Sequence, residues 1–81
     1  MALRVLAFAR LRELVGAGAR DLELADGATV AEAWSALAAG AAELTQHRAS
    51  TRFARNGVLT DPGTVLHDGD EVALLPPVGG G

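Results

Sequence analysis

The chain has 81 residues, a formal net charge of −3 and a hydrophobic fraction of 49%, which fits one small domain with a single core. It contains no cysteine, which excludes disulfides, thiolate nucleophiles, zinc–cysteine sites and iron–sulfur clusters. Seven arginines against ten acidic residues argue against nucleic-acid binding, and no apolar run is long enough to span a membrane. We therefore expect a soluble cytoplasmic protein that binds neither nucleic acid nor membranes.

The first part of the chain predicts two strands around a short helix. Residues 3–9 alternate, with Leu3 and Val5 on one side and Leu6 and Phe8 on the other, which is typical of a strand. Residues 10–15 change to helical spacing, and glycines end that pattern. Residues 20–24 alternate again before an Asp-Gly turn, which predicts a second strand.

The principal helix is predicted to begin after Thr29, because Glu32 follows three residues later and the two residues form a capping box. Its apolar stripe at helical spacing, which we assign to the core, consists of Val30, Ala33, Trp34 and Leu37. Gly40 weakens the helix, but the alanines beyond it leave the end of the helix open. Residues 46–50 are expected to form a loop.

The last part of the chain predicts three strands joined by tight turns. Residues 51–55 and 58–60 flank Asn56-Gly57, the pair favoured in a two-residue hairpin turn. Residues 71–75 form the final strand, and Pro76 and Pro77 end it because neither can donate a backbone hydrogen bond. The order strand, strand, helix, strand, short strand, strand predicts an α+β roll in which a single helix covers one face of a mixed sheet.

A search for conventional catalytic or metal sites finds no convincing set of residues. His47 and His67 are expected to be solvated loop residues, since no third ligand stands at a suitable spacing. Asp68, Asp70 and Glu71 cluster around a turn, where hydrogen bonding within the turn is the expected role of such acids. No serine lies in a glycine-flanked nucleophile elbow. We predict no metal and no permanently bound cofactor.

The C-terminus is the unusual element of this sequence. Val78, Gly79, Gly80 and Gly81 follow directly after the final strand and two prolines. A tail without side chains that ends in a carboxylate can enter a narrow channel of another protein, where any side chain would collide with the walls. We therefore interpret residues 1–77 as the folded domain and residues 78–81 as a flexible, reactive tail.

Residues 68–81 with their Pro-Pro-Val-Gly-Gly-Gly ending, residues 8–16 and the Asn56-Gly57 turn resemble the MoaD/ThiS family of ubiquitin-like sulfur carriers. The small subunits of molybdopterin synthases belong to that family. The resemblance spans the whole chain and implies a β-grasp fold. Two residues depart from the pattern: Gly79 stands where serine or threonine is common, and Arg55 stands where an apolar residue is usual. The second departure leaves open which way the third strand faces.

The resemblance implies a sulfur carrier that acts through its last residues, Gly80 and Gly81. A MoeB-type, E1-like adenylyltransferase would use ATP to convert the Gly81 carboxylate into an acyl-adenylate, and a sulfur donor would displace AMP to leave a thiocarboxylate. In a heterotetramer with a MoaE-type large subunit, the tail would donate sulfur to cyclic pyranopterin monophosphate and form the molybdopterin dithiolene. Catalytic side chains would belong to the partner, so whether this chain counts as an enzyme stays open.

Strand alternation also predicts a surface for binding the partner. If Val5 faces the helix, Phe8 and Leu75 lie on the opposite, open face of the sheet, where Leu59 joins them. The alternative is that the short helix at residues 10–15 covers this face. The predicted partner-binding residues are Phe8, Leu59, Leu75, Pro76, Pro77, Val78 and Gly79.

Two other functions remain open at this point. One is a sulfur carrier for another pathway, such as thiamine thiazole or tungsten cofactor synthesis, which would use the same chemistry with different partners. The other is a β-grasp interaction module whose terminus is chemically silent. Exchange of oxygen for sulfur at the C-terminus would separate both carriers from the silent module, and the identity of the partner would separate the two carriers.

Overall fold

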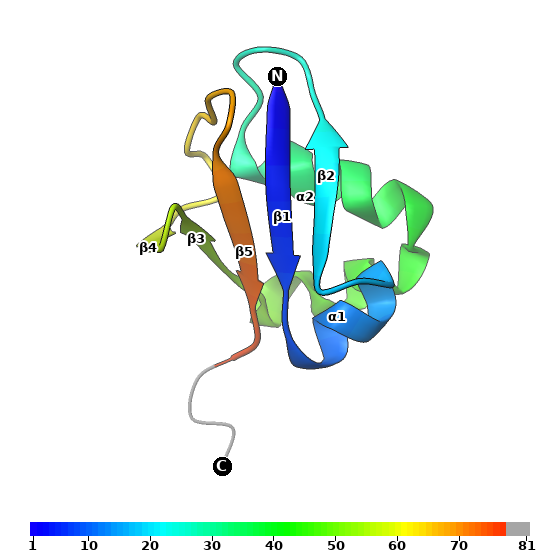
Figure 1. Ribbon diagram of the computed structural model, residues 1–81. Coiled ribbons are helices and arrows are strands. Elements are labelled where there is room, and N and C mark those ends of the chain that lie inside the picture. The colour runs from blue at the N-terminus through cyan, green and yellow to red at the C-terminus, as the bar shows by residue number, and fades with distance from the viewer. Residues whose placement is uncertain (78–81) are drawn as a thin grey trace.

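The computed structural model describes residues 1–77; residues 78–81 lie outside the described part of the chain (Figure 1). The five strands of its single sheet are β1 Ala2–Ala7, β2 Ala19–Glu23, β3 Arg52–Arg55, β4 Val58–Thr60 and β5 Glu71–Leu75. The helical segments are α1 Ala9–Val15, α2 Val30–Gly40 and the 3-10 helix η1 Ala42–Ser50. The predicted α+β class is confirmed.

The sheet is mixed, as predicted, and its strand order is β2-β1-β5-β3-β4. β1 and β5 run parallel, whereas the β1–β2, β3–β4 and β3–β5 pairs are antiparallel. β5 therefore lies in the middle of the sheet with a hydrogen-bonded neighbour on each side. The C-terminal end of the described chain leaves the sheet from this central strand, at the end opposite to Met1 (Figure 1).

The capping box at the start of α2 is confirmed. The backbone N–H of Glu32 donates to Thr29 Oγ1 at 3.2 Å, and the backbone N–H of Thr29 donates to Glu32 Oε1 at 3.2 Å. The predicted apolar stripe of α2 is buried, and it faces the sheet. Trp34 in this stripe packs edge-on against Phe53 of β3, with ring centroids 5.8 Å apart. Helix α2 thus joins the sheet through the aromatic pair as well as through aliphatic contacts.

The expectation of a loop at residues 46–50 is wrong, because these residues belong to the 3-10 helix η1. Leu44, which is fully buried, anchors the first turn of η1 in the core. At the other end, the His47 carbonyl oxygen accepts hydrogen bonds from Thr51 Oγ1 at 2.6 Å and from Ser50 Oγ at 3.2 Å. These long-range packing and local capping contacts stabilise a segment whose sequence has weak helical periodicity.

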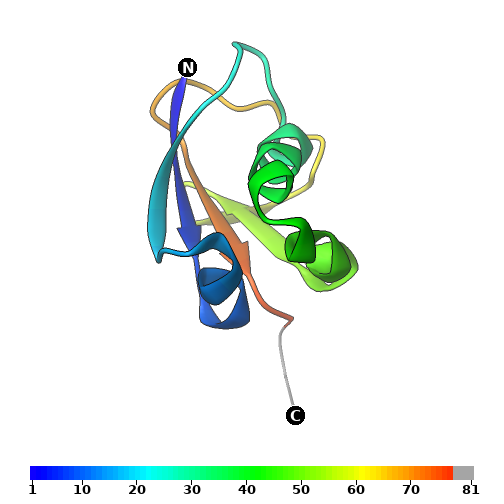
Figure 2. The same ribbon diagram turned by 90° about the vertical axis from the view of Figure 1, so that its right-hand side faces the viewer.

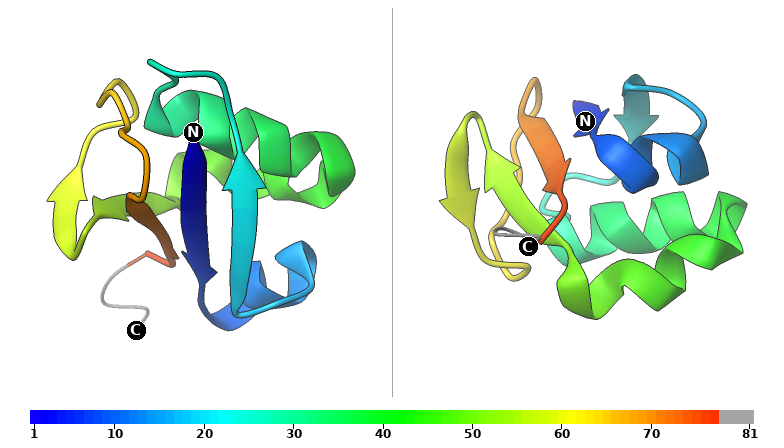
Figure 3. Two further views of the ribbon diagram at one scale, coloured as in Figure 1. Left: turned by 45° about the horizontal axis from the view of Figure 1, so that its top comes forward. Right: turned by 90° about the horizontal axis from the view of Figure 1, so that it is seen from below.

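The expectation of a single helix on the sheet is also incomplete. α2 and η1 lie together on one side of the sheet, and α1 closes the lower end of the same side (Figure 2). Leu11 of α1 and Leu44 of η1 both belong to the core cluster that the sheet and α2 form. Figure 3 shows the same layering from two further directions, with the helical segments grouped on one side of the strands.

The strand boundaries differ slightly from the prediction. β1 ends at Ala7 rather than at residue 9, because α1 begins at Ala9, where φ is +53° and the chain turns away from the sheet. The hairpin turn is confirmed: Asn56 and Gly57 have φ values of +49° and +83°, which is the left-handed conformation at both central positions.

Candidate functional site

The first part of the candidate site is the place where the chain leaves the sheet. Leu75 is the last residue of β5 and pairs with Arg52 of β3. Pro76 is half-buried and Pro77 is exposed. The predicted tail residues Val78, Gly79, Gly80 and Gly81 lie outside the described residues, so their assignment stays a prediction.

An apolar row crosses the open face of the sheet beside this exit point. Directly paired residues share a face, and the register pairs Leu6 with Ala73, Ala73 with Ala54, and Ala54 with Leu59. The alternate residues of the same strands, Val5 among them, are buried against the helices. The predicted division of the strands into two faces is therefore confirmed.

Phe8 and Leu59 are the large exposed side chains at the two ends of this apolar surface. Phe8 is 46% exposed and Leu59 is 62% exposed. Large apolar side chains that stay this exposed are typical of surfaces that bind another protein. We call the set Leu6, Phe8, Ala54, Leu59, Ala73 and Leu75 the open-face patch.

Helix α1 does not cover the open-face patch. Its Leu11 is buried in the core together with η1, and Leu14 and Val15 pack against the same core. Phe8 is the extended N-cap residue of α1, and the turn at Ala9 carries the helix to the opposite side of the sheet. Of the two interpretations offered by the sequence, the uncovered patch agrees with the structure of residues 1–77.

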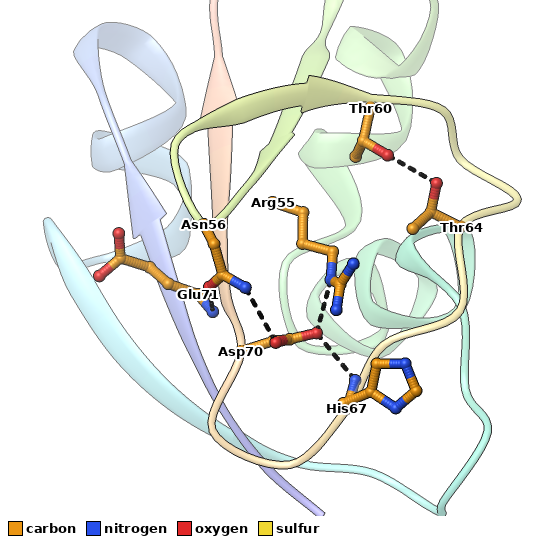
Figure 4. A network of polar contacts seen from close by, with 7 residues as sticks. All are labelled: Arg55, Asn56, Thr60, Thr64, His67, Asp70 and Glu71. Carbon is orange, nitrogen blue, oxygen red and sulfur yellow. Dashed lines mark hydrogen bonds and ion pairs between the residues drawn. The ribbon is translucent and has the colours of Figure 1, made fainter.

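A polar hub lies at the other end of β5 and β3 (Figure 4). The Asp70 carboxylate accepts hydrogen bonds from Arg55 Nε at 2.7 Å, from Asn56 Nδ2 at 3.0 Å and from the backbone N–H of His67 at 2.8 Å. Asn56 in turn accepts from the Glu71 backbone N–H at 2.9 Å through its Oδ1. The hub thus joins the hairpin turn, the turn before β5 and the first residue of β5.

The hub strongly favours the ionised form of Asp70. Hydrogen bonds from Arg55, which has the largest effect, and from Asn56 and the His67 backbone together lower the pKa of this carboxyl from 3.8 to about 2, against the opposing effect of burial. The side chain of Asp70 is 9% exposed and that of Arg55 is 33% exposed. The pair therefore forms a partly buried, charge-assisted contact.

The hub also settles which way Arg55 faces. Arg55 pairs with Val72 in the sheet register, and Val72 is buried on the helix side. Arg55 thus lies on the helix side of β3, at the position where the family pattern usually has an apolar residue. The Asp70 carboxylate compensates its charge. The expected role of Asp70 in turn hydrogen bonding is confirmed by the His67 N–H contact, whereas its arginine partner, fifteen residues earlier in the chain, was not predicted.

The remaining polar candidates do not assemble into a site. Among residues 1–77, no group of three or more histidine, cysteine or acidic side chains has a geometry that could hold a metal ion. His67 is exposed, but His47 is half-buried and belongs to η1 rather than to a loop. Asp68 accepts a hydrogen bond from the Ala2 backbone N–H at 2.6 Å, which ties the turn before β5 to the start of β1.

In the described part of the chain, no helix is both long and apolar enough to cross a membrane.

The sheet order, the parallel central pair and the helix packed across one face define a ubiquitin-like β-grasp fold. The family model described as the ThiS family matches residues 5–81, and the chain belongs to that family. The match includes both the β-grasp domain and the glycine-rich end of the sequence.

Two curated relatives have the same printed name. The chain is 36% identical over 83 residues to the molybdopterin synthase sulfur carrier subunit of Chlamydomonas reinhardtii, with 100% of both chains covered. It is 32% identical over 79 residues to the molybdopterin synthase sulfur carrier subunit of Arabidopsis thaliana, with 98% of this chain and 82% of the relative covered.

Solved structures are similar over the whole chain. SAMP1 from Haloferax volcanii has a TM-score of 0.88 at 29% identity, with 100% of both chains covered. A protein–protein complex of subunits 1 and 2 of the molybdopterin-converting factor from Helicobacter pylori gives a TM-score of 0.70 at 27% identity, again with 100% of both chains covered. The resemblance to the MoaD/ThiS family that the sequence indicated is therefore confirmed.

Proposed function

We propose that this protein is the sulfur carrier subunit of a molybdopterin synthase and that it acts through the carboxylate of Gly81. The observation that carries the proposal is the family match over residues 5–81, together with two curated relatives named as sulfur carrier subunits. The open-face patch beside the exit of β5 supports the proposal, because a carrier needs a surface that holds a partner while the tail is delivered.

The carboxylate of Gly81 is a poor electrophile and must first be activated. An adenylyltransferase transfers AMP from ATP to the Gly81 carboxylate, which releases pyrophosphate and leaves an acyl-adenylate with a good leaving group. A sulfur donor then attacks the acyl carbon, the bond to AMP breaks, and the chain ends in a thiocarboxylate. Sulfur is softer and more nucleophilic than oxygen, so this end group can attack the cyclic pterin precursor in the large subunit.

The partners follow from the same proposal. A large subunit receives the tail and supplies the catalytic side chains, and two copies of each subunit form a heterotetramer. The complex of subunits 1 and 2 of the molybdopterin-converting factor from Helicobacter pylori supports a large-subunit partner. ATP is used by the adenylyltransferase and is not a resident cofactor of this chain.

Intact-mass measurement tests the chemistry directly. The full chain is incubated with ATP, an adenylyltransferase and a sulfur donor, and the expected result is a mass increase equal to the exchange of one oxygen for sulfur. A variant that lacks both Gly80 and Gly81 is the matched control and should show no exchange, because it has lost the Gly-Gly end. Absence of exchange in the unmodified chain would leave only the chemically silent β-grasp module.

A second measurement distinguishes a molybdopterin carrier from a carrier of the thiamine pathway. The thiocarboxylate form is mixed with the large subunit and cyclic pyranopterin monophosphate, and we expect the dithiolene product. Sulfur transfer to a thiazole-forming enzyme instead, with no product from the pterin precursor, would assign the chain to the thiamine route.

A further inference from the structure

The net charge of −3 conceals a strong separation of charge along the strands. The end of the sheet that holds Met1 is acidic: Glu23 ends β2, Glu71 begins β5, and Asp26 and Asp68 lie in the adjoining turns. The Met1 ammonium lies 3.8 Å from Glu23 and 3.5 Å from Asp26, and Arg4 is the cross-strand neighbour of Glu71, so these two cations offset only part of the charge of the four acids. This end therefore carries a net negative charge.

The opposite end, where β5 leads to the tail, is basic. Four arginines lie on the segments that meet there, namely α1, the end of η1 and the start of β3: Arg10, Arg12, Arg48 and Arg52. The acids of α1 and η1 are Glu13 and Glu43, and both pair with Arg10, at 2.7 and 3.5 Å. Within residues 1–77, the other three arginines make no ion pair.

Arg48 and Arg52 line the same shallow groove, which lies between η1, β3 and β4. Arg52 is the direct cross-strand neighbour of Leu75, so the groove begins beside the last residue of β5. Leu59 also lines the groove and belongs to the open-face patch. The groove is therefore continuous with the apolar surface and adjacent to the point where the tail departs.

Arg48 is held in place without being neutralised. Its Cζ atom lies 5.1 Å from the centroid of the Phe53 ring, in a cation–π contact. Phe53 is buried and is itself fixed by the edge-on contact with Trp34. Because the guanidinium is already oriented, less conformational entropy is lost when it binds an anionic group.

We propose that Arg48 and Arg52 form a docking site for carboxylate side chains on the rim of the partner channel that receives the tail. This inference rests on the proposed function and specifies the chemistry of its partner surface. Guanidinium groups bind carboxylates through paired hydrogen bonds, and a partner that covers the open-face patch brings its rim over both arginines. The acidic end of the molecule is repelled by the same rim, so the charge separation orients the carrier with its tail toward the channel.

The test is the rate of association with two purified partners, the large subunit and the adenylyltransferase, measured by stopped flow. At about 0.01 M ionic strength, where charges act over about 30 Å, we expect the Arg48→Glu/Arg52→Glu double variant to associate at least about tenfold more slowly with at least one partner. At about 1 M, where screening is nearly complete, the two rates should converge.

Matched variants separate the effect of position from the effect of charge. Arg52→Glu and Arg20→Glu make the same charge change, but Arg20 lies on β2 at the far edge of the sheet. Arg52→Glu should slow association more than Arg20→Glu does, because only Arg52 lies in the groove beside Leu75. The Arg48→Lys/Arg52→Lys variant keeps both charges and should retain most of the rate, and the fluorescence of Trp34 checks that each variant is folded.

Three results would overturn the docking site. The first is a wild-type rate that does not depend on ionic strength, and the second is equal rates for Arg52→Glu and Arg20→Glu with both partners. The third is binding of ATP to the isolated chain that the double glutamate variant abolishes, which would make the groove a phosphate site. The mass exchange at Gly81, measured at saturating adenylyltransferase, tests the proposed function separately, because it does not depend on the association rate.

Discussion

Replacement of Asp70 by asparagine tests the polar hub that joins β3, β5 and the hairpin turn. Asparagine has nearly the same shape but no charge, so Arg55 loses its counter-ion while the packing is preserved. The asparagine amide also replaces one acceptor oxygen by a donor, although three donors converge on the wild-type carboxylate. At least one of those hydrogen bonds must therefore be lost.

The magnitude follows from the lowered pKa. A fall from 3.8 to about 2 corresponds to roughly 2.5 kcal/mol of differential stabilisation, at about 1.36 kcal/mol per pKa unit. Arg55 is one-third exposed, so water close to the pair reduces this contribution to about 1–2 kcal/mol. The donor that loses its acceptor adds about 1 kcal/mol, which gives an expected loss of about 2–3 kcal/mol at pH 7.

The dependence on pH has a definite sign. Because the pKa of Asp70 is lower in the folded state than in the unfolded chain, its contribution is fully present above about pH 4. It declines as the pH falls through the interval between 3.8 and about 2. The free energies of unfolding of the wild type and Asp70→Asn should therefore approach each other by about 1–2 kcal/mol between pH 7 and pH 2.

Urea unfolding monitored by the fluorescence of Trp34 measures these differences, because this residue is the only tryptophan and is buried. Asp68→Asn is the matched control: Asp68 is exposed and accepts its hydrogen bond from Ala2 through Oδ1, which asparagine retains. We expect this control to change stability by less than about 0.5 kcal/mol. Equal losses in both variants, or a loss in Asp70→Asn that is the same at pH 7 and pH 2, would refute the role assigned to the hub.

Other substitutions test the core, the helix start and the open-face patch. Leu44→Ala should lower the free energy of unfolding in urea by about 2–5 kcal/mol, because the side chain is fully buried; a loss typical of a surface residue would contradict its place in the core. Thr29→Ala should cost about 1 kcal/mol in the same assay through loss of the capping hydroxyl, and no change would mean that the capping box contributes nothing. Phe8→Asp and Leu75→Asp should weaken binding of the large subunit by at least about tenfold in calorimetry and leave the urea midpoint nearly unchanged, since neither side chain is in the core. Unchanged affinity in both variants would remove the patch from the interface.

Local sequence signals predicted most of the elements for identifiable physical reasons. The Thr29 and Glu32 capping box and the Asn56-Gly57 turn act through residues close in sequence, so their geometry can be predicted without knowledge of the fold. Strand alternation correctly divided the residues of β1 and β5 into a buried and an open face. The position of α1 could not be predicted from strand alternation, because the turn at Ala9 depends on how Leu11 packs into the core.

Two features depend on contacts between distant residues and were therefore missed. The 3-10 helix η1 is anchored by Leu44 in a core that includes residues from both ends of the chain. The Arg55–Asp70 pair joins positions fifteen residues apart that become neighbours only when β3 pairs with β5. An arginine on the buried side of a strand signals that a counter-ion is needed, but the sequence offers ten acids and no means of choosing among them.

The geometry of the exit point restricts where a partner can bind. Under the proposed function the reactive carboxylate belongs to Gly81, four residues beyond Pro77; a fully extended chain spans at most about 3.6 Å per residue, so this carboxylate reaches no more than about 14 Å beyond Pro77. Under the proposed function, the reactive centre of each partner must therefore lie close to the surface that contacts the end of β5. Under the same proposal, this limit favours docking groups close to Leu75, such as the open-face patch and the two groove arginines. A docking surface at the acidic end of the sheet would leave so short a tail outside the partner's channel.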